Sequence, residues 1–213
     1  EGYQVFAERV STGVARLDAV LGGGPLRASS ILVTGAPGTA KTSLAASMVA
    51  ASCAAGRRAV FVSFDESDAQ IIANMKSIGL APGRHVRPGQ LRMLSLMSAG
   101  NSPEECFLRI SELVRDHEPS LLVVDPMSTF SRSGYTFAAA ISESLINLAK
   151  KGGITFLGTS LIAQADGWSE ESASHVSTIA DVWIHLSYVA QNGERNRAIT
   201  IIKARGTEHS NQV

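Results

Sequence analysis

The sequence is poor in cysteine and has no long apolar run. Cys53 and Cys106 are the only two cysteines, and they lie far apart without the spacing of metal ligands. Two lone thiols favour a reducing compartment, so we expect a cytoplasmic protein that buries both thiols as small apolar side chains. No apolar run approaches the roughly 20 residues of a membrane-spanning helix, and no signal-peptide pattern is visible. A membrane partner is therefore not expected.

An excess of charge of one sign is also missing. The chain has 19 Lys and Arg against 19 Asp and Glu, so its formal net charge is zero. Without a field of one sign over the whole chain, a dedicated nucleic-acid binder is disfavoured. The 213 residues, of which 45% are hydrophobic, suffice for one domain with a substantial core.

What the sequence does contain is a regular alternation of apolar, β-branched runs with segments of helical period. Nearly continuous apolar strands that alternate with helices are typical of a parallel sheet covered on both faces. We expect strands at 30–35, 59–64, 91–96, 121–125 and 154–160, and helices at 41–55, 67–78, 103–117 and 136–150. The predicted class is α/β, with a mostly parallel sheet flanked by helices.

The pattern changes after residue 180. Two apolar segments, 181–189 and 197–205, flank the pair Asn192-Gly193, which is a strong signal for a hairpin turn. The sequence therefore predicts a C-terminal antiparallel hairpin at one edge of the sheet.

Residues 35–42, Gly-Ala-Pro-Gly-Thr-Ala-Lys-Thr, follow an apolar strand and open an Ala-rich helix. This is the context of a phosphate-binding P-loop, in which backbone amides and the helix N-terminus hold an anion. Lys41 would reach the β- and γ-phosphates, and the Thr42 hydroxyl would bind Mg²⁺. The expected nucleotide contacts are Gly35, Pro37, Gly38, Thr39, Ala40, Lys41, Thr42 and Ser43.

Ala40 stands where the P-loop motif has its last glycine. A methyl group is tolerated there if the backbone keeps a negative φ, because only left-handed conformations strongly require glycine. Gly38 still offers a permissive position inside the loop, and we expect the loop to be intact. The alternative is a strand-to-helix turn that happens to carry Lys-Thr.

Acidic residues end two of the predicted strands. Asp125 follows four apolar residues, where P-loop enzymes place an acid that holds Mg²⁺ through water. Asp65 and Glu66 end the strand after the P-loop helix, and the carboxyl ends of parallel strands share one edge. We expect Glu66 to orient or deprotonate the nucleophile, supported by Asp65, and to join Thr42 and Asp125 as a metal ligand. The alternative is that these acids, or Ser67, only cap helices.

Six motifs together carry a family resemblance: RVSTGVARLDAVLGGG, the P-loop, SFDES, VVDP, SHVSTIADVWIHLSY and RAITIIKARGTEHS. With the motifs in this order, the sequence resembles a KaiC domain over nearly its whole length. KaiC domains are a branch of the RecA-type ATPases. The resemblance implies a homo-hexameric ring with ATP held between neighbouring subunits. KaiC proteins carry two such domains in tandem, and residues 1–213 resemble one of the pair, more closely the C-terminal, phosphorylating one.

The resemblance also implies roles near the C-terminus. It places adjacent phosphosites at Ser177 and Thr178, which the residues alone would describe as an ordinary Ser-Thr pair before a strand. Lys203 and Arg205 have the spacing of two that points side chains the same way on a strand.

From the residues alone, Lys203 and Arg205 would be solvated charges. The resemblance implies that both face the ATP of the neighbouring subunit and act as an arginine finger does. Arg197 is a weaker candidate for such a contact. His209 is a further candidate contact to the nucleotide.

The leading hypothesis is an ATP-hydrolysing ring protein with serine/threonine autokinase activity in a clock-like or signalling role. A RecA/RadA-type DNA-dependent ATPase would need basic loops with stacking aromatics, but the loop 161–172 is acidic and the loop 127–137 has only Arg132. A slow, nucleotide-gated interaction module that recruits a clock or two-component signalling protein is the third hypothesis. Nucleic acid is not expected as a partner.

Overall fold

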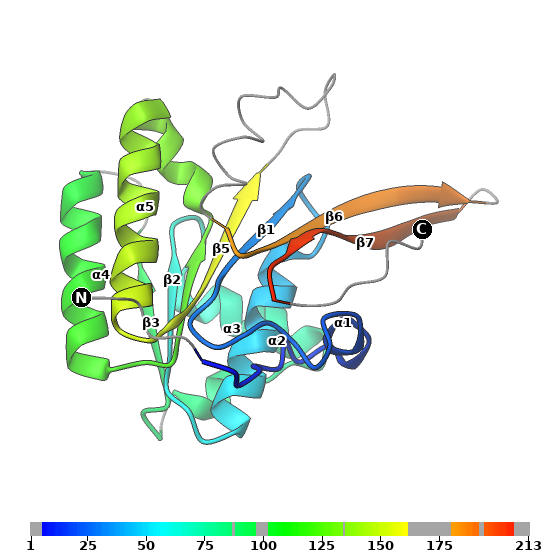
Figure 1. Ribbon diagram of the computed structural model, residues 1–213, viewed down its shortest axis with the longest axis horizontal. Coiled ribbons are helices and arrows are strands. Elements are labelled where there is room, and N and C mark those ends of the chain that lie inside the picture. Colours follow the sequence, from blue (N-terminus) through cyan, green and yellow to red (C-terminus); the bar gives the residue numbers. More distant parts are fainter. Residues whose placement is uncertain are drawn as a thin grey trace.

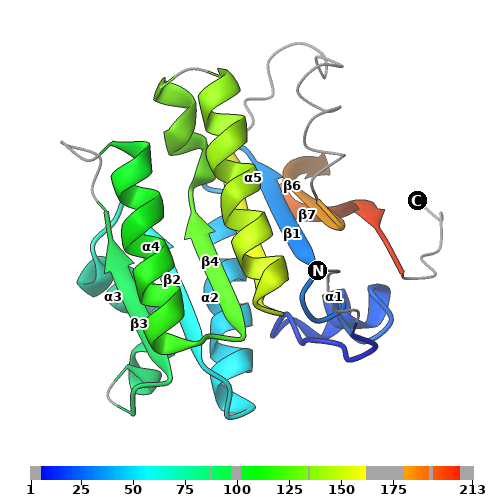
Figure 2. The same cartoon turned by 60° about the vertical axis from the view of Figure 1, so that its left-hand side comes forward.

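The computed structural model describes residues 6–86, 88–96, 102–133, 135–161, 180–191 and 194–206. These residues form one seven-stranded sheet with helices on both faces (Figures 1 and 2). The strand order is β3-β2-β4-β5-β1-β6-β7, and six strands run parallel. The predicted α/β class is confirmed.

The strands occur where apolar runs predicted them. Their bounds are β1 Ser30–Gly35, β2 Ala59–Ser63, β3 Leu91–Ser95, β4 Leu121–Asp125, β5 Thr155–Leu161, β6 Val182–Gln191 and β7 Glu194–Ala204. β6 pairs with β1 in parallel and with β7 in antiparallel orientation. The predicted hairpin is therefore confirmed, with both strands longer than expected, while its turn residues 192 and 193 lie outside the described residues.

Helices separate the strands as predicted. Their bounds are α1 Ala15–Val20, α2 Lys41–Ala54, α3 Asp68–Ser77, α4 Pro103–His117 and α5 Tyr135–Lys151, with 3-10 turns η1 Pro82–His85 and η2 Met127–Ser133. Capping boxes begin α3 and α4, in which Ser67 pairs with Gln70 and Ser102 with Glu105. Within the described ranges, no helix combines the length and apolar character that spanning a membrane requires.

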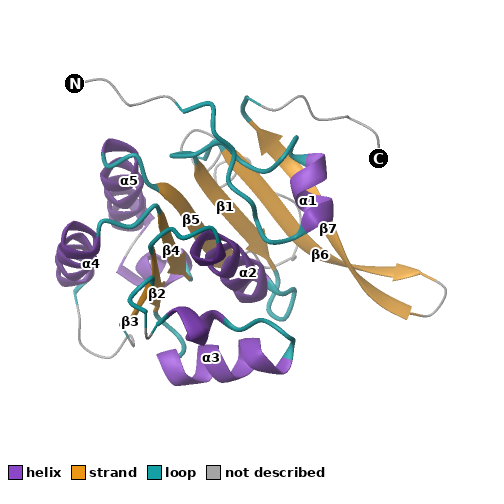
Figure 3. Cartoon of the chain, turned by 90° about the horizontal axis from the view of Figure 1, so that it is seen from below, coloured by secondary structure: helices purple, strands orange, loops and turns teal. Residues whose placement is uncertain are grey.

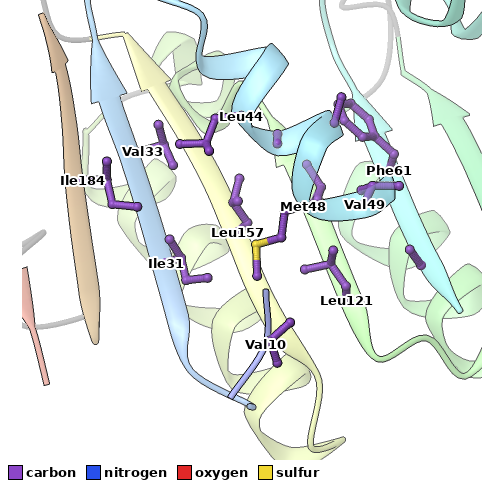
Figure 4. Close-up of a cluster of buried hydrophobic side chains, with 14 of the residues drawn as sticks. Val10, Ile31, Val33, Leu44, Met48, Val49, Phe61, Leu121, Leu157 and Ile184 are labelled. Carbon is purple, nitrogen blue, oxygen red and sulfur yellow. The ribbon is translucent and has the colours of Figure 1, made fainter. Parts of the chain in front are cut away.

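The sheet separates two hydrophobic layers. On one face α2 packs against the strands, and Leu44, Met48 and Val49 contact the layer that contains Ile31 and Leu157 (Figure 4). On the other face α4 and α5 cover the sheet (Figure 3). Because the central strands are covered on both faces, they form nearly continuous apolar runs in the sequence.

The two cysteines belong to these layers. Cys53 is buried in the α2 layer and Cys106 in the α4 layer, and both are free thiols. Burial raises the pKa of Cys53 to about 11 and also raises that of Cys106, so both remain protonated and unreactive at neutral pH. The prediction of buried, structural cysteines is confirmed.

The N-terminal segment braces the helix that follows the phosphate loop. Asp18 in α1 accepts hydrogen bonds from the Thr12 amide and hydroxyl and from the Ser11 hydroxyl. This closed turn places Gly13 against α2, where a Cβ on Gly13 would lie 2.5 Å from the Ser47 carbonyl oxygen. Only a glycine permits this approach.

Gly13→Ala should lower the free energy of unfolding more than Gly56→Ala does. Both glycines have φ of 77°, so each alanine bears the left-handed strain of about 1–2 kcal/mol. A Cβ on Gly56 meets nothing within 4 Å, whereas one on Gly13 meets α2, which adds about 1–3 kcal/mol. Urea unfolding of both variants measures the difference, and equal losses would contradict the close packing.

Candidate functional site

The phosphate loop joins β1 to α2 at the carboxyl edge of the sheet. Thr39, which is 2% exposed, closes the turn by donating its hydroxyl to the Ala36 carbonyl (2.8 Å). The N-cap of α2 is Ala40, whose side chain cannot cap the helix. The first amides of α2 therefore face the loop without a side-chain acceptor, which is the arrangement that binds phosphate at a helix N-terminus.

The condition of a negative φ at Ala40 is not met. Ala40 has φ 79° and ψ 30°, in the left-handed region that glycine normally occupies. The chain must reverse direction at Ala40 to begin α2. This reversal requires a left-handed backbone, although the clash of the Ala40 Cβ with the backbone costs about 1–2 kcal/mol. Such strain persists only where surrounding contacts hold the backbone in place.

Lys41 supplies part of that support. Its ammonium group donates to the carbonyl oxygens of Gly35 (2.8 Å) and Ala36 (2.9 Å), and the residue is 8% exposed. Burial lowers the pKa of Lys41, and the nearby negative charge of Asp125 opposes the shift. The ammonium is thus held over the loop, where an anion can reach it.

Asp125 lies at the end of β4, next to the loop, and is 7% exposed. Burial raises the pKa of its carboxyl group. Hydrogen bonds from the Thr159 and Thr42 hydroxyls and the positive charge of Lys41 act in the opposite direction and lower this pKa. The negative charge of Asp65 adds to the increase. These interactions show that four predicted site residues, Lys41, Thr42, Asp65 and Asp125, converge at one edge of the sheet.

The donor set at this edge fits magnesium. The Thr42 hydroxyl and the Asp125 carboxylate are hard oxygen ligands in mutual contact, which Mg²⁺ prefers, and phosphate oxygens would complete its shell. Over the described ranges, no group of three or more His, Cys, Asp or Glu side chains forms a metal cage. Thr159, which donates to Asp125 from within β5, was not identified from the sequence.

Glu66 and Asp65 occupy different positions after β2. Asp65 is exposed beside Asp125, whereas the half-buried Glu66 accepts a hydrogen bond from the Asn74 side-chain amide of α3 (2.8 Å). The cap of α3 is Ser67, so neither carboxylate is used for capping. Nothing in the sequence pattern indicated Asn74, because only the packing of α3 brings it to Glu66.

Lys203 and Arg205 are not brought to the phosphate loop of their own chain. Lys203 pairs with Trp183, which pairs with Leu32 of β1, three residues before Gly35. This register places Lys203 about 10 Å from Gly35 along the strands and two strands, about 10 Å, across the sheet. Arg205 lies farther still, because its amide donates to Asp181 beside the first residue of β1.

Asp181 forms the centre of a charged group at this opposite end of the sheet. Its carboxylate accepts from the Lys150 ammonium (2.8 Å) and from the amide and hydroxyl of Ser30, and Arg205 Nη1 lies 3.6 Å away. Burial acts to raise the pKa of Asp181, but the bonds from Lys150 and Ser30 outweigh it and lower the pKa. Burial and the charges of Arg205 and Lys150 lower the pKa of Lys203, which Asp181 opposes. The group is therefore rich in positive charge.

His185 is a buried residue near the loop that the sequence did not single out. Its Nδ1 lies 3.0 Å from the Thr34 hydroxyl, which also accepts from the Trp183 indole (2.9 Å), immediately before Gly35. Burial and the charge of Lys41 lower the pKa of His185.

The predicted site residues Ser177, Thr178 and His209 lie outside the described residues.

A phosphate loop at the head of a parallel sheet, with carboxylates at the adjacent strand ends, defines a P-loop nucleotide-binding protein. The family model described as "ATPase: KaiC" matches residues 10–213, and the chain belongs to the KaiC ATPase family. Membership of this family implies nucleotide binding.

Proteins similar to the chain include two described as clock proteins. It is 39% identical over 214 residues to "Circadian clock protein KaiC2" of Synechocystis sp., covering 99% of the chain and 38% of that protein. It is 35% identical over 207 residues to "Circadian clock oscillator protein KaiC" of Synechococcus elongatus, covering 96% of the chain and 40% of that protein. The chain thus spans about two fifths of the length of these relatives.

The free energy of unfolding should fall as the pH drops from about 7.5 to about 5.5. His185 and His117 both have pKa values lowered by burial, so the unfolded chain binds protons more readily than the folded chain below about pH 6.5. The two histidines contribute fully to the free energy of unfolding above that pH. This contribution is lost as the pH falls through their pKa values in the folded state. His185→Gln should flatten the dependence measured by urea unfolding, and His117→Gln should flatten it further. An unchanged slope in the double variant would disprove the assignment.

Proposed function

We propose that the chain is an ATP-binding and ATP-hydrolysing domain of a ring-forming protein with serine/threonine autokinase activity, in a clock-like or signalling role. The observation that carries this proposal is the convergence of Lys41, Thr42, Asp65 and Asp125 at the carboxyl ends of β1, β2 and β4. The clock names of the relatives support the choice of role.

The phosphate loop would hold the triphosphate of ATP. Lys41 would transfer its hydrogen bonds from the Gly35 and Ala36 carbonyls to phosphate oxygens, which restores full charge compensation to a buried ammonium. Thr42 and Asp125 would hold Mg²⁺, with Glu66 as the further candidate ligand. The ion, when bound, neutralises charge on the phosphates.

Glu66 would activate the nucleophile. Asn74 fixes one carboxylate oxygen and leaves the other able to accept a proton or orient a hydroxyl. The nucleophile would be water in hydrolysis and the hydroxyl of Ser177 or Thr178 in autophosphorylation. Asp65, exposed beside Asp125, would add negative charge that favours proton acceptance at this edge.

The remaining cations would act on a neighbouring chain. Lys203 and Arg205 lie at the end of the sheet opposite to their own phosphate loop, yet they form a positive group that suits a phosphate. A homo-hexamer with ATP at subunit interfaces would bring them to the neighbour's γ-phosphate, where they would stabilise charge in the transition state. His209 would contact the same nucleotide. Partner proteins would be clock or two-component signalling proteins.

Glu66→Gln should retain ATP binding but lose turnover by about 100-fold or more, because it removes the group that activates the nucleophile. Phosphate release measures hydrolysis, and mass spectrometry after incubation with Mg-ATP measures phosphate on Ser177 and Thr178. Lys41→Ala should abolish binding as well. Turnover by Glu66→Gln equal to that of the unsubstituted chain would refute the catalytic role, and unmodified Ser177 and Thr178 would refute autokinase activity.

Mixing two inactive variants tests the action of Arg205 across subunits. A Lys41→Ala chain has an intact Arg205, and an Arg205→Ala chain has an intact phosphate loop. In mixed rings about one quarter of the interfaces combine both intact parts, so ATP turnover should reappear on mixing. Lys41→Ala mixed with Glu66→Gln is the matched control, since both residues belong to one chain's site and no activity should return. Recovery no greater than in this control would show that Arg205 does not act across the interface.

A further inference from the structure

The β6-β7 hairpin carries a second polar feature, on the face opposite to Lys203. Along β6, the side chains of Trp183 and His185 meet Thr34 on one face of the sheet, while Ile184 and Leu186 belong to the α2 layer on the other. Alternation along a strand places Tyr188 on the α2 face, where the phosphate loop also lies.

The register carries Tyr188 to the phosphate loop of its own chain. Leu186 pairs with Gly35, the last residue of β1, and Tyr188 lies two residues farther along β6. A Cβ placed on Gly38 would lie 2.8 Å from the Tyr188 hydroxyl oxygen, so the phenol tip contacts the middle of the loop. Gly38 has φ of 78° and belongs to the turn whose amides would hold phosphate.

Arg195 of β7 holds the ring in this position. Its guanidinium carbon lies 4.0 Å from the centre of the Tyr188 ring, in a cation–π contact. Arg197 stands directly opposite Tyr188 across the hairpin and adds a second positive charge to the exposed strand. The Tyr188 hydroxyl thus borders the loop, and two cations of the same chain lie next to Tyr188 on β7.

This group offers hydrogen-bond donors from the Tyr188 hydroxyl and the Arg195 guanidinium. Among the residues that the structure describes, the Tyr188 hydroxyl has no hydrogen-bond partner and Arg195 forms no ion pair with a carboxylate. A phenol donor beside the phosphate-loop amides, with a guanidinium stacked on its ring, is complementary to phosphate oxygens.

We propose that Tyr188 and Arg195 form an additional phosphate contact of the nucleotide site, made by the same chain that supplies the phosphate loop. The Tyr188 hydroxyl donates to a phosphate oxygen above Gly38, and Arg195 positions the ring and adds positive charge. The inference rests on the proposed nucleotide binding and extends it, because it gives the hairpin a role on each of its two faces.

Binding of Mg-ATP and of inorganic tripolyphosphate to Tyr188→Phe tests the contact. This variant keeps the ring and loses only the hydroxyl, so the Kd for both ligands should rise about tenfold, as expected for a hydrogen bond to a charged group. Arg195→Met should also raise both Kd values and reduce their salt dependence. The combined variant should lose less than the product of the single effects, since Arg195 acts partly through Tyr188.

Three comparisons make the result decisive. Arg115→Met removes an exposed arginine from α4, far from the loop, and should leave both Kd values unchanged. Unchanged tripolyphosphate binding by Tyr188→Phe, or a loss seen with ATP alone, overturns the inference, because the contact would then be absent or made to the nucleoside. Lys41→Ala separates the two proposals. Normal ATP binding by Lys41→Ala would refute nucleotide binding at the phosphate loop itself. Loss of ATP binding in Lys41→Ala together with normal ATP binding by Tyr188→Phe would overturn only the hairpin contact.

Discussion

The structure depends on how one buried ammonium group is compensated at the head of α2. Lys41 lies over the phosphate loop and donates to the carbonyls of Gly35 and Ala36, with Asp125 nearby. Removing a charge from water is costly unless partners surround it, so these groups must stay close to Lys41. The hydrogen bonds of Lys41 also hold the loop in its turn and support the left-handed backbone of Ala40. An arrangement that offers an ammonium and uncapped amides to the same point is a site for a polyanion.

Sheet topology decides which residues reach that point. β1 lies between β5 and β6, and the chain crosses to β2, β3 and β4 on the other side of β5, so the strand order changes direction beside the loop. Ligands of open α/β sheets bind at such a point, outside the carboxyl ends of the strands. Asp125 ends β4 there, Asp65 follows the end of the adjacent β2, and Thr159 lies in β5, between β4 and β1.

The β6-β7 hairpin places polar side chains at two separate regions of the sheet. Its register places Tyr188 at the loop and Lys203 near the opposite end of the sheet, on opposite faces. Asp181, fixed by Lys150 and Ser30, keeps Arg205 close to a carboxylate. Arg205 is more than half exposed, so its ion pair with Asp181 contributes little stability.

Local sequence determined much of this molecule. Apolar runs, helical periodicity and the Asn192-Gly193 pair predicted the strands, the helices and the hairpin, since each depends on neighbouring residues. The phosphate loop and the acids at strand ends followed from motifs of the same local kind. Tertiary structure alone decided the left-handed backbone at Ala40 and the pairing of Asn74 with Glu66. It alone also decided the separation of Lys203 from its own loop and the contact of Tyr188 with Gly38. Each of these depends on the packing and register of segments far apart in the chain, which no local pattern encodes.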